Sequence, residues 1–127
     1  MVFLLLLAAC GSEADTAACG GEPCLTLLSP TDGSIVCGTP LAVVTDVANF
    51  TLTNETIEDP PPDTGHMHVY LNGQEVAQTD METVYVPEVA DGEWQLSLDL
   101  ASADHSALDP YVGLVIYITV DNTLCSG

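Results

Sequence analysis

The stretch DGEWQLSLDLAS, residues 91–102, decides the fold class of this chain. Apolar and polar residues alternate from Trp94 to Leu100, which is the period of a strand with one buried face. Asp91 and Gly92 come directly before this run and form a turn signal. A slip by one residue would expose the whole apolar set, so the alternation also fixes the register of the strand.

Further strand signals lie on both sides of this stretch, and no segment is a convincing helix. Turn and loop sequences separate them, among them Asn72-Gly73 and the proline-rich EDPPPDTG at residues 58–65. The expected strands cover residues 25–28 with 34–37, 41–52, 66–71, 75–78, 83–86, 94–100 and 112–120. These are about seven strands, and they predict an all-β, immunoglobulin-like antiparallel β-sandwich.

The N-terminal sequence MVFLLLLAAC resembles the signal and lipobox of a bacterial lipoprotein. The resemblance implies cleavage before Cys10, lipidation of Cys10 and attachment to a membrane through that lipid. It divides the chain into a signal segment (1–9), a lipidated cysteine with a flexible tether (10–23) and an immunoglobulin-like domain (24–127). The alternative interpretation is a remnant of another apolar segment that ends in LAAC by chance.

The resemblance also implies a location. It places the domain in the bacterial cell envelope, on the extracytoplasmic side. Gly11, rather than an aspartate, follows the lipidated cysteine, and this favours the outer membrane.

The charge of the chain excludes several partners. There is no Lys or Arg against 19 Asp and Glu, which gives a formal net charge of −19. Nucleic-acid binding needs cationic side chains that displace phosphate counterions, so we expect no nucleic-acid partner. An acidic surface attracts cations, but no EF-hand spacing is present. No nucleophile lies in a catalytic pattern either, and we expect a protein that is not an enzyme.

Four cysteines remain once Cys10 is assigned to the lipid, and they predict two disulfides. Residues 34–37 should run parallel beside the last strand, which would bring Cys37 to Cys125. Cys19 and Cys24 would then close a small loop where the tether enters the domain. The rival pairing joins Cys24 to Cys37.

The three histidines converge in the predicted topology. His66 and His68 share one strand face, opposite an apolar set formed by Met67, Val69 and Leu71. If that apolar set is core, both histidines point outward. His105 follows the neighbouring strand by a few residues, so it should lie at the same corner, with Asp99 or Asp104 beside it.

Imidazoles on one strand face are ligands that copper and zinc accept, and a carboxylate can complete the shell. The corner is therefore a candidate copper or zinc site. Two alternatives stay open: a hydrogen-bonded cluster that pins the loop, and ordinary polar surface.

Residues 25–120 resemble an uncharacterised family of secreted bacterial immunoglobulin-like domains. The resemblance rests on SPTDGSIV, DVANFTL, GHMHVYLNG, DGEWQLSLDLASADHSALDP and VIYITV. The positions that match the recurring motifs of that family are Gly65, His66, His68, Asp104, His105, Asp109 and Pro110. The histidine-rich segment that some relatives carry between the two motifs is missing here, because residues 78–83 hold no histidine. The resemblance implies fold and compartment, and no activity.

Two functions follow from these observations. The first is a lipid-anchored, non-catalytic extracytoplasmic binding module of unknown ligand. It would contact an envelope protein through sheet edges or loops such as residues 58–65. The alternative is a periplasmic copper- or zinc-binding protein that uses the three histidines.

Overall fold

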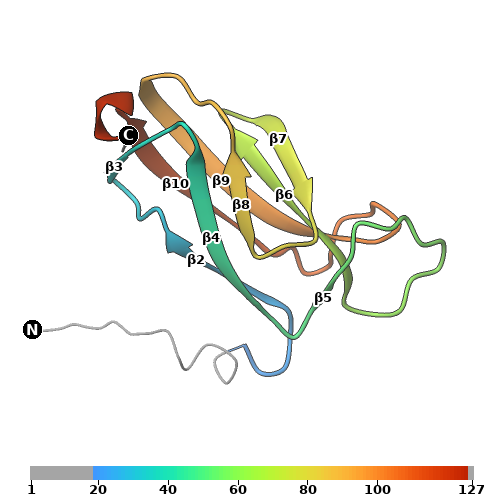
Figure 1. Ribbon diagram of the computed structural model, residues 1–127. Helices are drawn as coiled ribbons and strands as arrows, with labels where there is room; N and C mark the ends of the chain where they lie inside the picture. The colour runs from blue at the N-terminus through green and yellow to red at the C-terminus, as the bar shows by residue number, and fades with distance from the viewer. Residues whose placement is uncertain (1–18, 126–127) are drawn as a thin grey trace, which may run out of the picture.

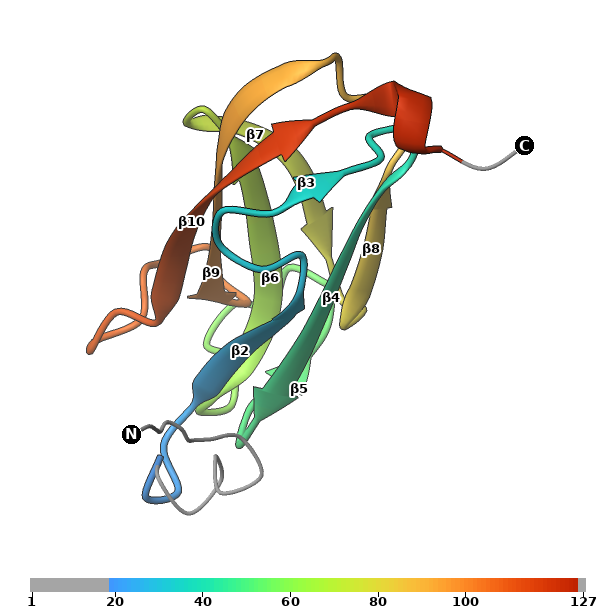
Figure 2. The ribbon, with the colours of Figure 1, turned by 90° about the vertical axis from the view of Figure 1, so that its left-hand side faces the viewer.

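The computed structural model describes residues 19–125, which form a sandwich of two β-sheets (Figures 1 and 2). The larger sheet has the order β3 (Ile35–Val36), β10 (Gly113–Val120), β9 (Gly92–Ser102), β6 (Thr64–Leu71) and β5 (Thr51–Leu52), and β7 (Gln74–Thr79) also pairs with β6. The smaller sheet holds β2 (Cys24–Ser29), β4 (Leu41–Ala48) and β8 (Thr83–Val86). A short 3-10 helix, η2 (Asn122–Leu124), follows β10. The predicted all-β, immunoglobulin-like sandwich is confirmed.

The core lies between the sheets and is built by the alternation that the sequence displays. Leu96, Leu98 and Leu100 of β9 are almost fully buried. Their antiparallel neighbours on β6, Met67 and Val69, are fully buried as well. Burial of a Leu or Met side chain contributes about 1.5–3 kcal/mol relative to an exposed position, so β6 and β9 contribute strongly to the stability of the sandwich.

The chain between residues 41 and 52 is one strand in our prediction and two strands in the structure. Asn49 has a φ of 62°, a left-handed conformation that asparagine tolerates better than most residues. The turn moves the chain from the small sheet to the large one, where β5 pairs in parallel with β6. Residues 25–28 and 34–37 likewise belong to different sheets, so the described residues contain nine strands rather than about seven.

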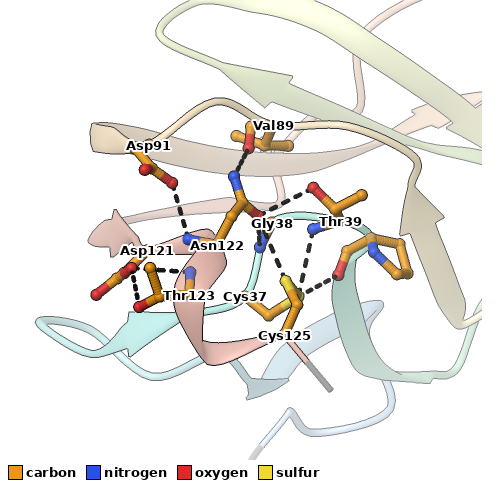
Figure 3. Close-up of a disulfide and its surroundings, with 10 residues drawn as sticks. Cys37, Gly38, Thr39, Val89, Asp91, Asp121, Asn122, Thr123 and Cys125 are labelled. Atoms are coloured by element: carbon orange, nitrogen blue, oxygen red, sulfur yellow. Dashed lines mark hydrogen bonds between the residues drawn. A yellow bond between two sulfur atoms is a disulfide. The ribbon is translucent and has the colours of Figure 1, made fainter. Parts of the chain in front are cut away.

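Both predicted disulfides are present, one at each end of the sandwich. Cys19 is bonded to Cys24, beside the start of β2. Cys37 is bonded to Cys125, because β3 runs parallel to β10 as predicted (Figure 3). The start of β2 and helix η2 lie at opposite ends in Figure 2. The disulfides and the fold fit a domain that works outside the cytoplasm.

The signal segment (1–9) and the predicted lipidation site Cys10 lie outside the described residues, so the lipid anchor stays a prediction. None of the helical segments among residues 19–125 has the length and apolar character that crossing a membrane requires.

Candidate functional site

The pairing of β6 with β9 places two histidines on the outer face of the large sheet. His66 lies opposite Ala101, and His68 lies opposite Asp99. Both histidines project away from the core because Met67, between them, is buried in it. Gly65 opens this part of the strand and lies opposite Ser102.

Two loops lie side by side at the end of β6 and β9 that carries His66: residues 53–63 between β5 and β6, and residues 103–112 between β9 and β10 (Figure 1). The amide of Ile57 donates to the carbonyl of Ala103 at 3.0 Å, and this bond ties the loops together. His66 is only 1% exposed. Both histidines point outward as predicted, but His66 is not part of an open polar surface, because it is buried on the outer side of the sheet.

The structure brings all three imidazoles together. The ring centroids of His66 and His68 are 4.8 Å apart, and those of His66 and His105 are 4.9 Å apart. His105 has a φ of 72°, a left-handed conformation in which histidine is enriched among non-glycine residues. The Nε2 atom of His105 lies 3.0 Å from the hydroxyl of Thr56, so a side chain of each loop joins the cluster. We call His66, His68 and His105 the histidine corner.

Asp99 holds His68 in one orientation. Nδ1 of His68 lies 3.1 Å from Oδ1 of Asp99, and the hydroxyl of Tyr70 lies 3.2 Å from the same nitrogen. The hydroxyl of Tyr111 donates to the other carboxylate oxygen of Asp99 at 3.2 Å. A proton on Nδ1 satisfies the carboxylate, which leaves the Nε2 lone pair of His68 for another partner.

His66 has no such support. Among the described residues, neither of its ring nitrogens has a hydrogen-bond partner, although both are buried. Burial is the main cause that lowers the pKa of His66, and charge on His68 and His105 lowers it further, while Glu75 and Asp99 oppose the shift. His66 is therefore neutral near pH 7, with one N–H and one lone pair both unsatisfied. An unpaired buried polar group costs about 1–3 kcal/mol, which makes this side chain unusual.

The two candidate carboxylates are placed differently. Asp99 lies beside the histidine corner, whereas the carboxylate of Asp104 accepts hydrogen bonds from the amide and the hydroxyl of Ser106 at 2.9 and 2.5 Å. These bonds to Ser106 lower the pKa of Asp104. Asp104 thus shapes the turn that carries His105.

Three residues that contact the histidine corner or Asp99 were not among the predicted site residues, namely Thr56, Tyr70 and Tyr111. Tyr70 lies two residues after His68 on the same strand face, and that spacing was a usable signal. Tyr111 folds back over Gly113, where a β-carbon would lie 2.6 Å from its hydroxyl. That contact depends on the path of the loop, which no periodicity encodes.

A hollow of about 170 Å³ opens beside the corner. Its lining includes His68, Tyr70, Asp99, His105 and Tyr111. With the rings as they lie, no three His, Cys, Asp or Glu side chains in the described part of the chain are arranged to hold a metal ion. The corner is thus a set of nearby nitrogen donors beside an open space.

A second surface lies on the outer face of β10. Val115 and Tyr117 point outward from this strand and are exposed, Tyr117 to 59%. Ile35 of β3 is exposed beside them, because β3 pairs with the end of β10. Tyr111 extends the row at the other end, over Gly113. We call Ile35, Tyr111, Val115 and Tyr117 the outer stripe.

No family model matches this chain, and no curated protein matches it. The fibronectin(III)-like modules of CbhA from Clostridium thermocellum match with a TM-score of 0.55 and 13% identity over 80% of this chain and 99% of that chain. The endo-beta-1,4-mannanase from Thermotoga petrophila matches with a TM-score of 0.51 and 14% identity over 80% of this chain but only 20% of that chain. The PKD domain of human KIAA0319 matches with a TM-score of 0.44 and 15% identity, over 84% of this chain and 89% of that chain. At 13–14% identity, the likeness to the CbhA modules and to part of the mannanase chain shows a shared fibronectin III-type, immunoglobulin-like fold alone.

Proposed function

We propose that this chain is a lipid-anchored, non-catalytic extracytoplasmic binding module that contacts an envelope protein through its outer stripe. The observation that supports this most directly is the row of exposed apolar and aromatic side chains on one sheet face. Tyrosine is enriched at the centre of protein interfaces, where one rigid ring covers a large area.

Tyr117 is held firmly enough to act as the anchor of such an interface. Its amide donates to the carboxylate of Asp32 at 2.8 Å, and its carbonyl accepts from the amide of Gly33 at 2.7 Å. Its hydroxyl accepts from the side-chain amide of Gln95 at 3.2 Å. A hollow of about 340 Å³, which Glu93 also lines, lies beside the ring. A side chain ordered in advance loses little entropy on binding.

The charge of the chain defines the chemistry of this partner. With 19 acidic residues and no Lys or Arg, two copies of the chain repel each other, which opposes self-association through the stripe. A partner with Arg or Lys beside apolar residues is complementary, because a guanidinium can lie on the ring of Tyr117 next to the carboxylate of Glu93. The proposed partner is therefore a basic surface of another protein.

The partner is tested by carbodiimide crosslinking in intact cells that produce the full chain. This reagent joins carboxylates to amines, and because the chain has no lysine, its carboxylates cannot be linked to lysines of a second copy. Tyr117→Ser is expected to lower the yield of the crosslinked complex about tenfold or more, since buried aromatic anchors carry much of the binding energy.

Tyr85→Ser is the matched control, because Tyr85 is equally exposed on the opposite sheet. It should leave the yield unchanged. Equal losses in both variants, or no specific adduct at all, would contradict the proposed use of the outer stripe.

The anchor is tested separately with Cys10→Ser in cells fed radioactive palmitate. The lipobox resemblance predicts that the variant loses the label and appears in the soluble envelope fraction, because the lipid would be attached through Cys10. Cys19→Ser serves as the control, because Cys19 is in a disulfide. Label that persists in Cys10→Ser would refute the lipid anchor.

A further inference from the structure

We infer that the histidine corner binds one copper or zinc ion through His66, His68 and His105. Its three ligands lie outside the outer stripe, although Tyr111 borders both, and the site requires no protein partner. The inference rests on the ring geometry, on the nitrogens that are free and on the cost of leaving His66 unsatisfied.

Two of the three ring separations, both involving His66, match those of imidazoles that share one ion. Two imidazoles bound to one ion through bonds of about 2.0 Å at a tetrahedral angle keep their ring centroids about 5 Å apart. The observed separations are 4.8 Å for His66 and His68 and 4.9 Å for His66 and His105. His66 thus lies between two neighbours, each at the spacing of a shared ligand shell.

Each histidine has a nitrogen to offer. His68 uses Nδ1 for Asp99, so Nε2 is free, and a carboxylate behind a ligating imidazole is the usual support that orients it. His105 uses Nε2 for Thr56, so Nδ1 is free. Both nitrogens of His66 are without a partner in the described structure.

The ring of His66 makes no hydrogen bond within the described part of the chain, so it can turn toward the free nitrogens of its neighbours without breaking one. The terminal torsion of histidine, between an sp³ and an sp² carbon, is broad and costs little to rotate. The backbone positions are already fixed by the β6–β9 pairing and by the bonded loops. Binding therefore requires rotation of side chains and no rearrangement of the fold.

The donor set defines the class of ion. Imidazole nitrogens suit copper and zinc, whereas calcium and magnesium prefer oxygen ligands. Three protein ligands leave one position of a tetrahedral ion open. The hollow lined by Tyr70, Asp99 and Tyr111 lies beside His68 and His105 and has room for a water or a small ligand there.

A purely structural role explains His66 poorly. A buried side chain that only fills space is better served by an apolar residue, because an unsatisfied imidazole costs stability. Native proteins accept such a cost at positions that serve function. An ion that takes one nitrogen of His66 would relieve part of this cost.

The test is calorimetric titration of the metal-free full chain with Zn²⁺ and with Cu²⁺. We expect one ion per chain with submicromolar affinity. His68→Ala should weaken it at least about 100-fold, because losing a ligand should cost no less than losing an outer-shell partner, which costs about 10–100-fold. Asp46→Asn, an exposed acidic position on β4 of the opposite sheet, should leave the affinity unchanged. Weak binding of several ions that is the same in all three proteins would overturn the inference.

His66→Leu separates a metal role from a structural one. The variant should lose the tight site and raise the unfolding midpoint of the metal-free chain by about 4–8 °C, because an apolar side chain replaces the unsatisfied imidazole. Tight binding that persists in this variant would also overturn the inference. Tyr117→Ser should bind the ion normally, so failure of the metal site and failure of the partner surface are distinguishable.

Discussion

Replacing Cys37 and Cys125 together by serine is expected to lower the free energy of unfolding by about 4–5 kcal/mol, because this disulfide closes a long loop. The two cysteines are 88 residues apart in sequence, so the bond restricts most of the unfolded domain. In the folded state it joins the end of β3 to the segment after η2 (Figure 3). A loss of this size is a large part of the 5–15 kcal/mol that holds most domains together.

The second disulfide is the control for this experiment. Cys19 and Cys24 are only five residues apart, and a loop this short contributes about 2 kcal/mol in the same treatment. Both double variants are compared with the wild-type chain by equilibrium urea unfolding. Equal losses in the two variants would contradict loop closure as the cause.

Asn122 keeps the end of the sandwich at Cys37 ordered in other ways. Its side-chain oxygen accepts from the amide of Gly38 and from the hydroxyl of Thr39, both at 2.9 Å, and its side-chain nitrogen donates to the carbonyl of Val89 at 3.0 Å (Figure 3). These bonds remain when the disulfide is removed. The double variant should therefore unfold at lower urea while its folded structure stays close to that of the wild type.

The sequence predicted the parts of the fold in which apolar and polar side chains alternate regularly along a strand. Strict alternation from Trp94 to Leu100 identified the buried face of β9, and Leu96 and Leu98 are indeed almost fully buried. The predicted neighbours β6 and β9 are paired, and β3 runs parallel to β10. The buried face follows from side-chain alternation, which is a local property of the chain, and the two pairings follow from the strand order of an immunoglobulin-like sandwich.

The rest depends on backbone geometry and on contacts distant in sequence. The division of residues 41–52 follows from the left-handed conformation of Asn49, which composition alone does not require. The burial of His66 depends on two loops, and the hydrogen bond between Ile57 and Ala103 that joins them has no sequence signature. The sequence therefore predicted that the three histidines lie close together, but it did not predict that His66 is buried.

Gly65→Ala is expected to lower the free energy of unfolding by about 3 kcal/mol or more, at the upper end of the range for overpacking. A β-carbon at this position would overlap the carbonyl oxygen of Ala101 and lie 2.9 Å from the carbonyl carbon of Ser102. Both atoms belong to the backbone of β9, in the middle of the large sheet, so they cannot move aside as a flexible side chain would. The same change at an unhindered position with suitable backbone angles is usually stabilising.

Gly73→Ala is the matched control for this effect, because a β-carbon there would meet nothing within 4 Å. Its φ of 83° still makes alanine unfavourable, by about 1–2 kcal/mol. Urea unfolding of the two variants thus separates steric overlap at Gly65 from backbone strain at Gly73.

Gly65→Ala should also push β6 away from β9 where His66 and His68 are held, so metal affinity should fall in that variant only. A Gly65→Ala protein as stable as the wild type would show that the two strands can separate at this point, and the close approach would then not be what positions the histidine corner.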